Sequence, residues 1–273
     1  MISSKLIKRD KSFFLSLFLF GTEPNKLNKT FLQIASLLLP LLLWSVICQL
    51  KLVSELFLPS PIAVFYSLLD MAESGILFED IFASTGRVFA GFIIATILSV
   101  PLGIAMGSFP SFCALCEPLI AMLRYMPAAA FTPLLIIYLG IEEAPKIALI
   151  FIGTVYFNVL MVMDSVKFVP RELIETTLTL GGNTKDLLIK VIARYSLPSI
   201  IDTLRINIAT SWNLVIVAEL IAAEVGLGKR IQLAQRFFRT EQIFAELIVL
   251  GIIGFTLDMS FRFLLRRTCK WAV

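Results

Sequence analysis

The chain has 273 residues, of which 58% are hydrophobic and only 16% are charged, and its mean hydropathy is +0.89. A soluble domain of this size carries charge at about a quarter of its positions, so the composition excludes an ordinary soluble protein. The formal net charge is +4 and histidine is absent, which argues against a nucleic-acid-binding surface and against chemistry that depends on histidine.

Several uncharged runs approach the roughly 20 residues that a helix needs to cross a bilayer. They lack the alternation of polar and apolar residues that is typical of a membrane barrel. Because backbone groups in lipid must be satisfied internally, we expect an all-α membrane protein with about six transmembrane helices. The predicted spans are residues 31–50, 88–107, 118–141, 147–163, 200–223 and 243–265.

The first residues, "MISSKLIKRDKSFFLSLFLFG", resemble a signal peptide, with basic residues before an apolar run. The run from Phe13 to Phe20 is short, and no small-residue cleavage site follows it. We therefore expect residues 1–30 to form an uncleaved cytoplasmic or interfacial arm, and residues 31–273 to form one transmembrane domain.

Loop charges predict the orientation of the chain, because loops on the cytoplasmic side are enriched in lysine and arginine. The charged residues of 1–30 are mostly basic, so this segment is placed inside. The charged residues of 51–84 are mostly acidic, so that segment is placed outside. Residues 164–198 and the C-terminal "RRTCK" then lie inside, so both termini are expected in the cytoplasm. The basic stretch "GKRIQLAQRFFRTEQ" would be external, as an amphipathic helix on the outer surface or lining a vestibule.

Two further local patterns predict minor features. The stretch 58–75 resembles an interfacial helix, in which Ser60 caps the first turn and Pro61 takes the first helical position. Of the four cysteines, Cys113 and Cys116 form a single Cys-x-x-Cys without further ligands, so we expect ordinary apolar packing rather than a metal site.

The block "RELIETTLTLGGNTKDLLIKVIARYSLP", residues 171–198, is charged and helix-like, although it lies between two apolar spans. Gly181 and Gly182 should end a first helix, because glycine readily takes the left-handed conformation. Asn183 or Thr184 can cap a second helix, with Asp186 in its first turn. This pattern predicts two short amphipathic helices at an angle, a rigid knob suited to a groove on a partner protein. The alternative is a loop that only covers the end of the bundle.

The same block resembles the cytoplasmic loop of permeases of importer-type ABC transporters. The motif of that loop is Glu-Ala-Ala, then Gly after three residues, Ile after nine more, and Leu-Pro after one more. In this chain Glu175-Thr176-Thr177 stands at the Glu-Ala-Ala position, Gly181 at the glycine and Val191 at the isoleucine, all with the spacing of the motif. Ala193-Arg194 stands at the Leu-Pro position, and Leu197-Pro198 follows four residues later, where relatives often have a second Leu-Pro. The segments "EPLIAMLRYMPAAAFTPLLIIYLGI" and "ATSWNLVIVAELIAAEVGLG" resemble the nitrate/sulfonate/bicarbonate/taurine branch, from about residue 59 to 265.

The resemblance implies a type I ABC importer-like permease with a cytoplasmic coupling helix that contacts a separate ATP-binding subunit. The implied contact residues are Arg171, Glu172, Glu175, Thr176, Thr177, Gly181, Gly182 and Leu187. The chain lacks the phosphate-binding loop of ATPases, since "GGNTKD" has the wrong spacing, so ATP and magnesium are expected on the partner and no cofactor on this chain. The other implied partners are a second permease copy, an external solute-binding protein and the lipid of the inner membrane, but no nucleic acid.

Polar residues inside predicted spans are candidates for the solute path, because they are costly in lipid. They are Arg124, Asn158, Trp212, Asn213 and Glu219. Arg124 could attract an anion, or extend to the membrane surface; the other four could instead join helices. Pro127 and Pro133 are expected to bend a pore helix, and Glu224 with Gly226-Leu227-Gly228 resembles the external gate turn of the family or is an ordinary helix stop.

We therefore expect the transmembrane permease subunit of an ABC importer, which is a transport component rather than an enzyme. The branch implies a small anion such as nitrate, bicarbonate, taurine or an alkanesulfonate, although some relatives carry pyrimidine or thiamin precursors. One alternative is an intramembrane enzyme acting on lipid or peptide, but no catalytic constellation is evident in the sequence. Another is a non-ABC carrier, which would not need the knob.

Overall fold

The computed structural model describes residues 26–271, which contain helices and no strand. The predicted all-α fold is therefore confirmed. The apolar run from Phe13 to Phe20 lies outside the described residues, as does most of the expected N-terminal arm. In chain order the helices are α2 (Lys26–Gln49), α3 (Pro61–Glu73), α4 (Ile76–Ser108), α5 (Pro110–Arg124), η1 (Ala128–Phe131), α6 (Thr132–Leu139), α7 (Glu143–Lys167), α8 (Arg171–Thr179), α9 (Thr184–Asp186), η2 (Leu187–Ile192), α10 (Ala193–Ala222), α11 (Leu227–Arg236) and α12 (Thr240–Thr268).

The described chain separates into two compact units, divided between Ala63 and Val64. The first unit contains α2, whose many exposed leucines suit lipid rather than water. After α2 the chain turns, and the Trp44 indole N–H donates to the Pro59 carbonyl at 3.0 Å. The expectation of one domain over residues 31–273 stays a prediction.

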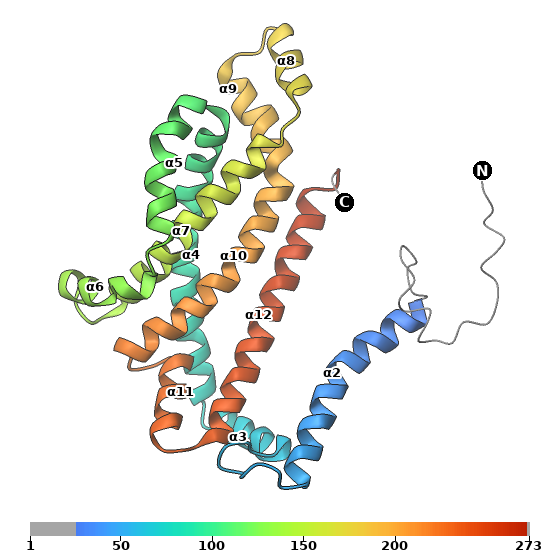
Figure 1. Cartoon of the computed structure of the whole chain (residues 1–273), viewed down its shortest axis with the longest axis vertical. Coiled ribbons are helices and arrows are strands. Elements are labelled where there is room, and N and C mark those ends of the chain that lie inside the picture. Colours follow the sequence, from blue (N-terminus) through green and yellow to red (C-terminus); the bar gives the residue numbers. More distant parts are fainter. Residues whose placement is uncertain (1–25, 272–273) are drawn as a thin grey trace, which may run out of the picture. The chain divides into compact units, whose positions relative to one another are not determined.

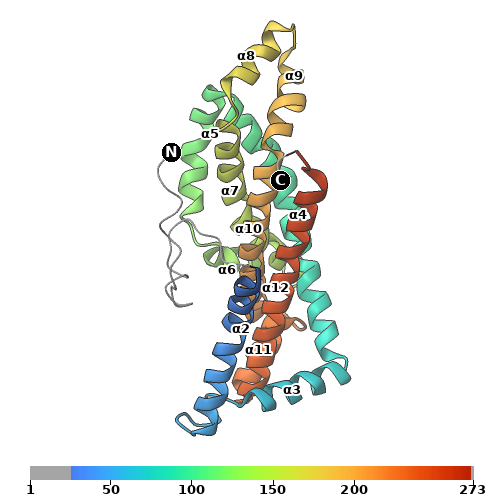
Figure 2. The same cartoon turned by 90° about the vertical axis from the view of Figure 1, so that its right-hand side faces the viewer.

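In the second unit, α4, α7, α10 and α12 run side by side (Figures 1 and 2). α4 and α10 each pack against α7, and α12 packs against α10. An apolar cluster joins α4, α5 and α7 around Met106, Val159 and Met163. Among the described residues, five helices are long and apolar enough to span a membrane, or six if one bent pair forms a single span. The exposed apolar faces of the long helices therefore suit contact with lipid, while α7 lies inside the bundle.

Three glycines of α4 allow the close approach of α7. A methyl group on Gly91, Gly103 or Gly107 would lie 2.6 to 2.7 Å from the Cβ of Ile150, Val162 or Val166, respectively. Non-bonded carbon atoms prefer about 3.5–4.0 Å, so the two helices touch through the bare backbone of α4.

Replacing Gly103 with leucine is expected to push α4 and α7 apart, because Val162 Cβ and the Val159 carbonyl already fill the space. Overpacking of this kind costs about 1–3 kcal/mol, occasionally more. Thermal unfolding of the purified protein in detergent measures the loss. Gly86→Leu on the same helix is the matched control, since nothing lies within 4 Å of its Cβ position. Equal melting temperatures for the two variants would contradict the packing argument.

The third predicted span, 118–141, is not one straight helix. α5 ends at Arg124, Tyr125 to Pro127 form a break, and η1 with α6 continues at 84° to α5. Pro127 supplies the turn, since its ψ of 122° is not helical. The expected bend at the prolines is therefore confirmed, and it divides the segment into two helices.

The other spans are longer than the uncharged runs from which they were predicted. α10 begins at Ala193 rather than near residue 200, and Leu197 and Pro198 lie within it instead of marking a helix end. The helices continue through charged residues where these residues pair with one another. Arg205 contacts Asp202 and, across to α12, Asp258, both at 3.2 Å, and Arg262 contacts Asp258 at 2.7 Å.

The second unit has two distinct ends (Figures 1 and 2). α8 and α9 project beyond the bundle at one end, which we call the knob end, and α11 lies toward the other, which we call the opposite end. α3 begins at Pro61, and the Ser60 hydroxyl accepts the Ala63 N–H at 3.2 Å, so the predicted cap is confirmed. The sequence predicted an amphipathic helix over "GKRIQLAQRFFRTEQ"; α11 forms over its first part with Leu227 and Ala234 buried, but it ends at Arg236, and the last residues of the stretch belong to α12.

Candidate functional site

The knob comprises residues 171–186, which are α8, a turn and α9. Gly181 follows α8 with φ of +81°, and the Gly182 N–H donates to the Thr177 carbonyl at 2.9 Å. Asn183 then caps the next helix by accepting the Asp186 N–H at 2.9 Å, while the Asp186 carboxylate accepts the Asn183 N–H at 3.4 Å. The predicted glycine stop and second cap are both confirmed, and they fix the angle between the two helices.

The knob is attached to the bundle through one apolar face. The knob contributes Ile174, which packs together with Leu187 and Leu188 of η2 on a small core of Val166, Val169 and Ile192. The opposite face points into solvent, and Leu180 at the tip is 81% exposed. The contact residues that the sequence analysis selected are mostly exposed on this face, namely Arg171, Glu172, Glu175, Thr176 and Gly181, whereas Thr177, Gly182 and Leu187 are half-buried.

One part of the predicted knob was wrong. The second helix is not a short separate helix, because α9 continues through the π-helix η2 into α10. The apolar residues that were assigned to a second amphipathic helix instead form the first turns of a membrane span. A displacement of the knob would therefore act directly on α10.

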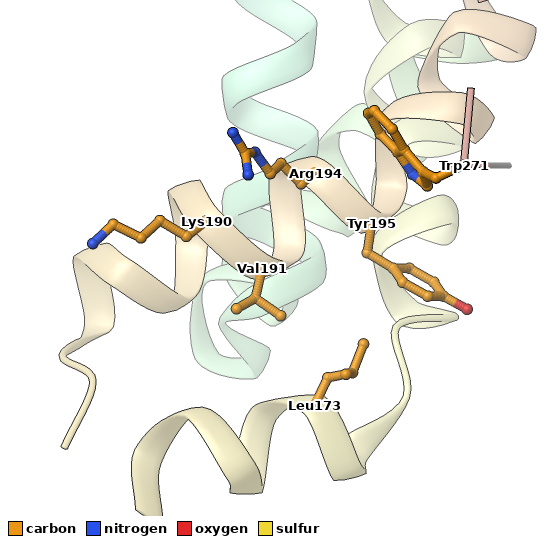
Figure 3. Close-up of a pocket in the computed structure, with 6 residues that line it drawn as sticks. All are labelled: Leu173, Lys190, Val191, Arg194, Tyr195 and Trp271. Atoms are coloured by element: carbon orange, nitrogen blue, oxygen red, sulfur yellow. The ribbon is translucent and has the colours of Figure 1, made fainter. Parts of the chain in front are cut away.

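A hollow of about 490 Å³ lies beneath the first helix of the knob. Figure 3 shows Leu173 of α8 pointing toward Val191 and Tyr195, while the side chain of Lys190 points away to one side. Arg194 and Trp271 complete the lining. The knob end thus offers apolar and basic side chains together, which suits a protein partner.

At the opposite end, the turn Ala223–Gly228 is held by side chains from two spans. Asp80 and Ser84 of α4 accept the backbone N–H groups of Gly226 and Leu227 at 2.8 and 3.0 Å. Glu219 of α10 accepts the Gly228 N–H at 2.8 Å. Gly226 has a φ of +139°, and a side chain there would meet the Glu219 carboxyl group at 2.5 Å. The "GLG" sequence is therefore required by the close approach of its backbone to Glu219.

Arg87 connects this turn to three helices. Its Nη1 donates to Glu219 Oε1 and to the Val225 carbonyl, both at 2.7 Å. Its Nε and Nη2 donate to the two oxygens of Glu143 on α7, at 2.5 and 2.8 Å. The Lys146 ammonium donates to the same Glu143 carboxylate at 2.9 Å. Charged pairs of this geometry are among the stronger hydrogen bonds in proteins, so α4, α7, α10 and the turn are joined at this end.

The comparisons with known proteins agree with this architecture. Residues 99–269 match the family model described as binding-protein-dependent transport system inner membrane component. The chain is 36% identical to a probable ABC transporter permease protein of Brucella melitensis, over 78% of this chain and 87% of the relative. It is 34% identical to the taurine transport system permease protein TauC of Escherichia coli, over 88% of this chain and 89% of the relative.

The chain belongs to this family. It is the permease subunit of an ABC importer, in the branch that contains permeases named for taurine, aliphatic sulfonates and bicarbonate. The fold is also shared with a chain of the inward-facing MetNI methionine ABC transporter, with a TM-score of 0.65 and 16% identity over 70% of this chain and 95% of that one. The protein is thus a multi-pass inner-membrane transport subunit, and ATP-binding and solute-binding proteins are its general partners.

The five residues suggested for the solute path lie in three separate places in the permease. Asn158 is fully buried between α7 and α10, where its side-chain oxygen accepts from Asn207 at 2.6 Å, and Trp212 is buried on α10. Asn213 is exposed on α10, and Glu219 is fully buried against the Ala223–Gly228 turn. Arg124 ends α5 and its guanidinium lies over the Tyr125 ring, 5.1 Å from the centroid. These contacts support the helix-joining interpretation for Asn158 and Glu219.

Sequence reasoning missed Arg87 and Lys146, the two cations that are buried among residues 26–271. Arg87 stands one residue before the uncharged run that defined the predicted second span, and Lys146 one residue before the fourth, so both were taken as loop residues. The helices continue past these charges: α4 (Ile76–Ser108) and α7 (Glu143–Lys167) are longer than the uncharged runs. Helix length, rather than absence of charge, would have placed Arg87 and Lys146 within the two helices.

Proposed function

We propose that two copies of this permease form the membrane pore of an importer for a small oxyanion, and that each knob binds an ATP-binding subunit in the cytoplasm. ATP and magnesium would be held by that subunit, and an external solute-binding protein would deliver the solute. Both termini and the knob would then lie inside, and the Ala223–Gly228 turn would lie at the outer face. Bicarbonate, taurine and alkanesulfonates are candidate solutes supported by the names of the relatives, and nitrate is a further candidate from the sequence resemblance alone.

The observation that carries the proposal is the exposure of apolar residues on a rigid, charged knob. Leu180 is 81% exposed and Leu178 is also exposed, yet the nearby Arg171, Glu172 and Glu175 make this surface unsuitable for lipid. A groove on a partner protein suits this surface, since the groove can cover the leucines and pair the charges. Because α9 continues into α10, closure of two ATP-binding subunits would tilt α10 directly.

Leu180→Asp is expected to reduce binding of the co-expressed ATP-binding subunit at least about tenfold, because an apolar contact worth at least about 1.4 kcal/mol is replaced by a buried charge. Copurification from membranes measures binding, and ATP-driven uptake into proteoliposomes measures function. The matched control is Phe237→Asp at the opposite end, an equally drastic change at an exposed apolar residue. This control should copurify normally. Normal assembly of Leu180→Asp would show that the knob tip is not the docking surface.

A further inference from the structure

A large cavity of the permease lies at the opposite end, between the first turns of α4 and α7 and the last turn of α10. Its volume is about 1030 Å³, and it is lined in part by Arg87, Glu143, Lys146, Glu142 and Glu224. The proposed orientation would place it on the outer side, where an imported solute first meets the membrane. Nothing in the sequence analysis assigned a role to its two cations.

Both cations in this cavity direct their donors at one exposed carboxylate. The side chains of Arg87 and Lys146 are only 6% and 5% exposed, whereas Glu143 is 55% exposed. Nη1 of Arg87 is engaged by Glu219 and Val225, which leaves the Nε–Nη2 edge for the two oxygens of Glu143. That edge is the one that binds carboxylates and other oxyanions through two parallel hydrogen bonds.

Glu143 is the member of this cluster that is most exposed to solvent. It is the first residue of α7, it follows Gly140–Glu142, and half of its side chain already contacts solvent. Arg87 would remain fixed through Glu219 and Val225, and Lys146 is anchored in the first turns of α7. A departing Glu143 would leave the buried Lys146 without its ion pair and the Nε–Nη2 edge of Arg87 without an acceptor, and an oxyanion could replace it in both contacts.

The rest of the cavity wall is acidic. Glu79, Glu142 and Glu224 are all exposed at the cavity, and Arg87 and Lys146 are the basic residues that line it. We call Glu79, Glu142 and Glu224 the acidic rim. It would repel a simple anion, because like charges repel each other at short range. A solute with an ammonium group beside its oxyanion would place the positive group against these carboxylates.

We propose that Arg87 and Lys146 form an oxyanion subsite that Glu143 fills when no solute is present, and that the acidic rim selects zwitterions of the aminosulfonate type. The proposal rests on the proposed import function, since it narrows the solute from small oxyanions in general to those that also carry an amine. On entry, the oxyanion takes the place of the Glu143 carboxylate, which rotates into solvent.

Taurine and ethanesulfonate are the matched probes, because they differ only by the amino group. Binding is measured by equilibrium dialysis on the complex of permease and ATP-binding subunit in nanodiscs, without ATP or solute-binding protein. We expect taurine to bind more tightly than ethanesulfonate. Glu143→Gln should strengthen taurine binding about tenfold by weakening the internal competitor, and Lys146→Gln should weaken it by a similar factor.

Two further results decide the proposal. The double variant Glu142→Gln, Glu224→Gln should remove the preference for taurine over ethanesulfonate, since the rim then loses two of its carboxylates. Equal taurine affinity in the wild-type protein and Glu143→Gln would show that Glu143 is only a structural contact and would overturn the subsite. Ethanesulfonate binding as tightly as taurine to the wild-type complex would overturn the selection by the rim.

Lys146→Gln and Glu143→Gln must assemble with the ATP-binding subunit as the wild-type protein does, which copurification checks. Assembly and ATP-driven uptake of some other oxyanion, with no taurine binding in this cavity, would refute the subsite while leaving the import function intact. Failure of the Leu180→Asp test described above would refute the docking surface instead, so the two proposals fail separately.

Discussion

Glu219→Ala is expected to lower the melting temperature of the permease sharply and to abolish uptake. The fully buried carboxylate accepts from Ser84, Arg87 and the Gly228 N–H at 2.7 to 2.8 Å. Alanine would leave three buried donors without this acceptor, and removal of one partner of a buried ion pair costs about 3–5 kcal/mol. That is a large part of the 5–15 kcal/mol by which folded proteins are typically stable. Thermal unfolding in detergent and solute uptake measure the two effects.

The control for this prediction is Glu219→Gln, which keeps the shape of the side chain and one oxygen acceptor. It should retain the hydrogen bond from Gly228 but lose both the charge and the acceptor opposite Arg87, because its amide nitrogen cannot accept, so its melting temperature should lie between those of the wild type and the alanine variant. If Glu219→Ala melted at the wild-type temperature, the buried bonds around the Ala223–Gly228 turn would not stabilise the opposite end.

Gly181→Val is expected to abolish assembly with the ATP-binding subunit while the permease still inserts into the membrane. Gly181 has a φ of +81°, a region that a β-branched residue rarely enters. The left-handed conformation costs an ordinary residue about 1–2 kcal/mol, and valine more, so the turn between α8 and α9 would change its direction. Leu180 would then no longer meet its groove. Copurification and the yield of inserted protein measure the two properties.

Gly181→Asn is the matched control, because asparagine tolerates the left-handed conformation far better than valine. No atom lies within 4 Å of the Gly181 Cβ position, so neither side chain clashes, and the comparison isolates backbone strain. Gly181→Asn should therefore assemble nearly normally. Equal uptake by the valine and asparagine variants would show that the angle of the knob is unimportant, and the assignment of the coupling helix would be wrong.

The fold class was predictable because lipid restricts the choices of a hydrophobic chain. Uncharged runs of about 20 residues indicate helices in a bilayer, and five of the six predicted spans overlap one long helix each, whereas the third is divided between α5 and η1 with α6. Local chemistry was equally readable in the knob, where Gly181 and Asn183 act through contacts with near neighbours in sequence. The boundaries were less predictable, since the fifth span was predicted to begin near residue 200, close to Asp202 and Arg205, whereas α10 begins at Ala193 and Arg205 pairs with Asp258 of α12.

The sequence by itself determined that this protein crosses a membrane through helices and carries a rigid knob, because both properties depend on residues close together along the chain. The tertiary structure decided which charges act together. Arg87, Glu143 and Glu219 are far apart in sequence, and their meeting depends on how α4, α7 and α10 pack. α4 and α7 approach closely because small residues recur at every fourth position of α4 from Gly91 to Gly107, and only the packing of the helices shows that Ile150 and Val162 of α7 lie against this face.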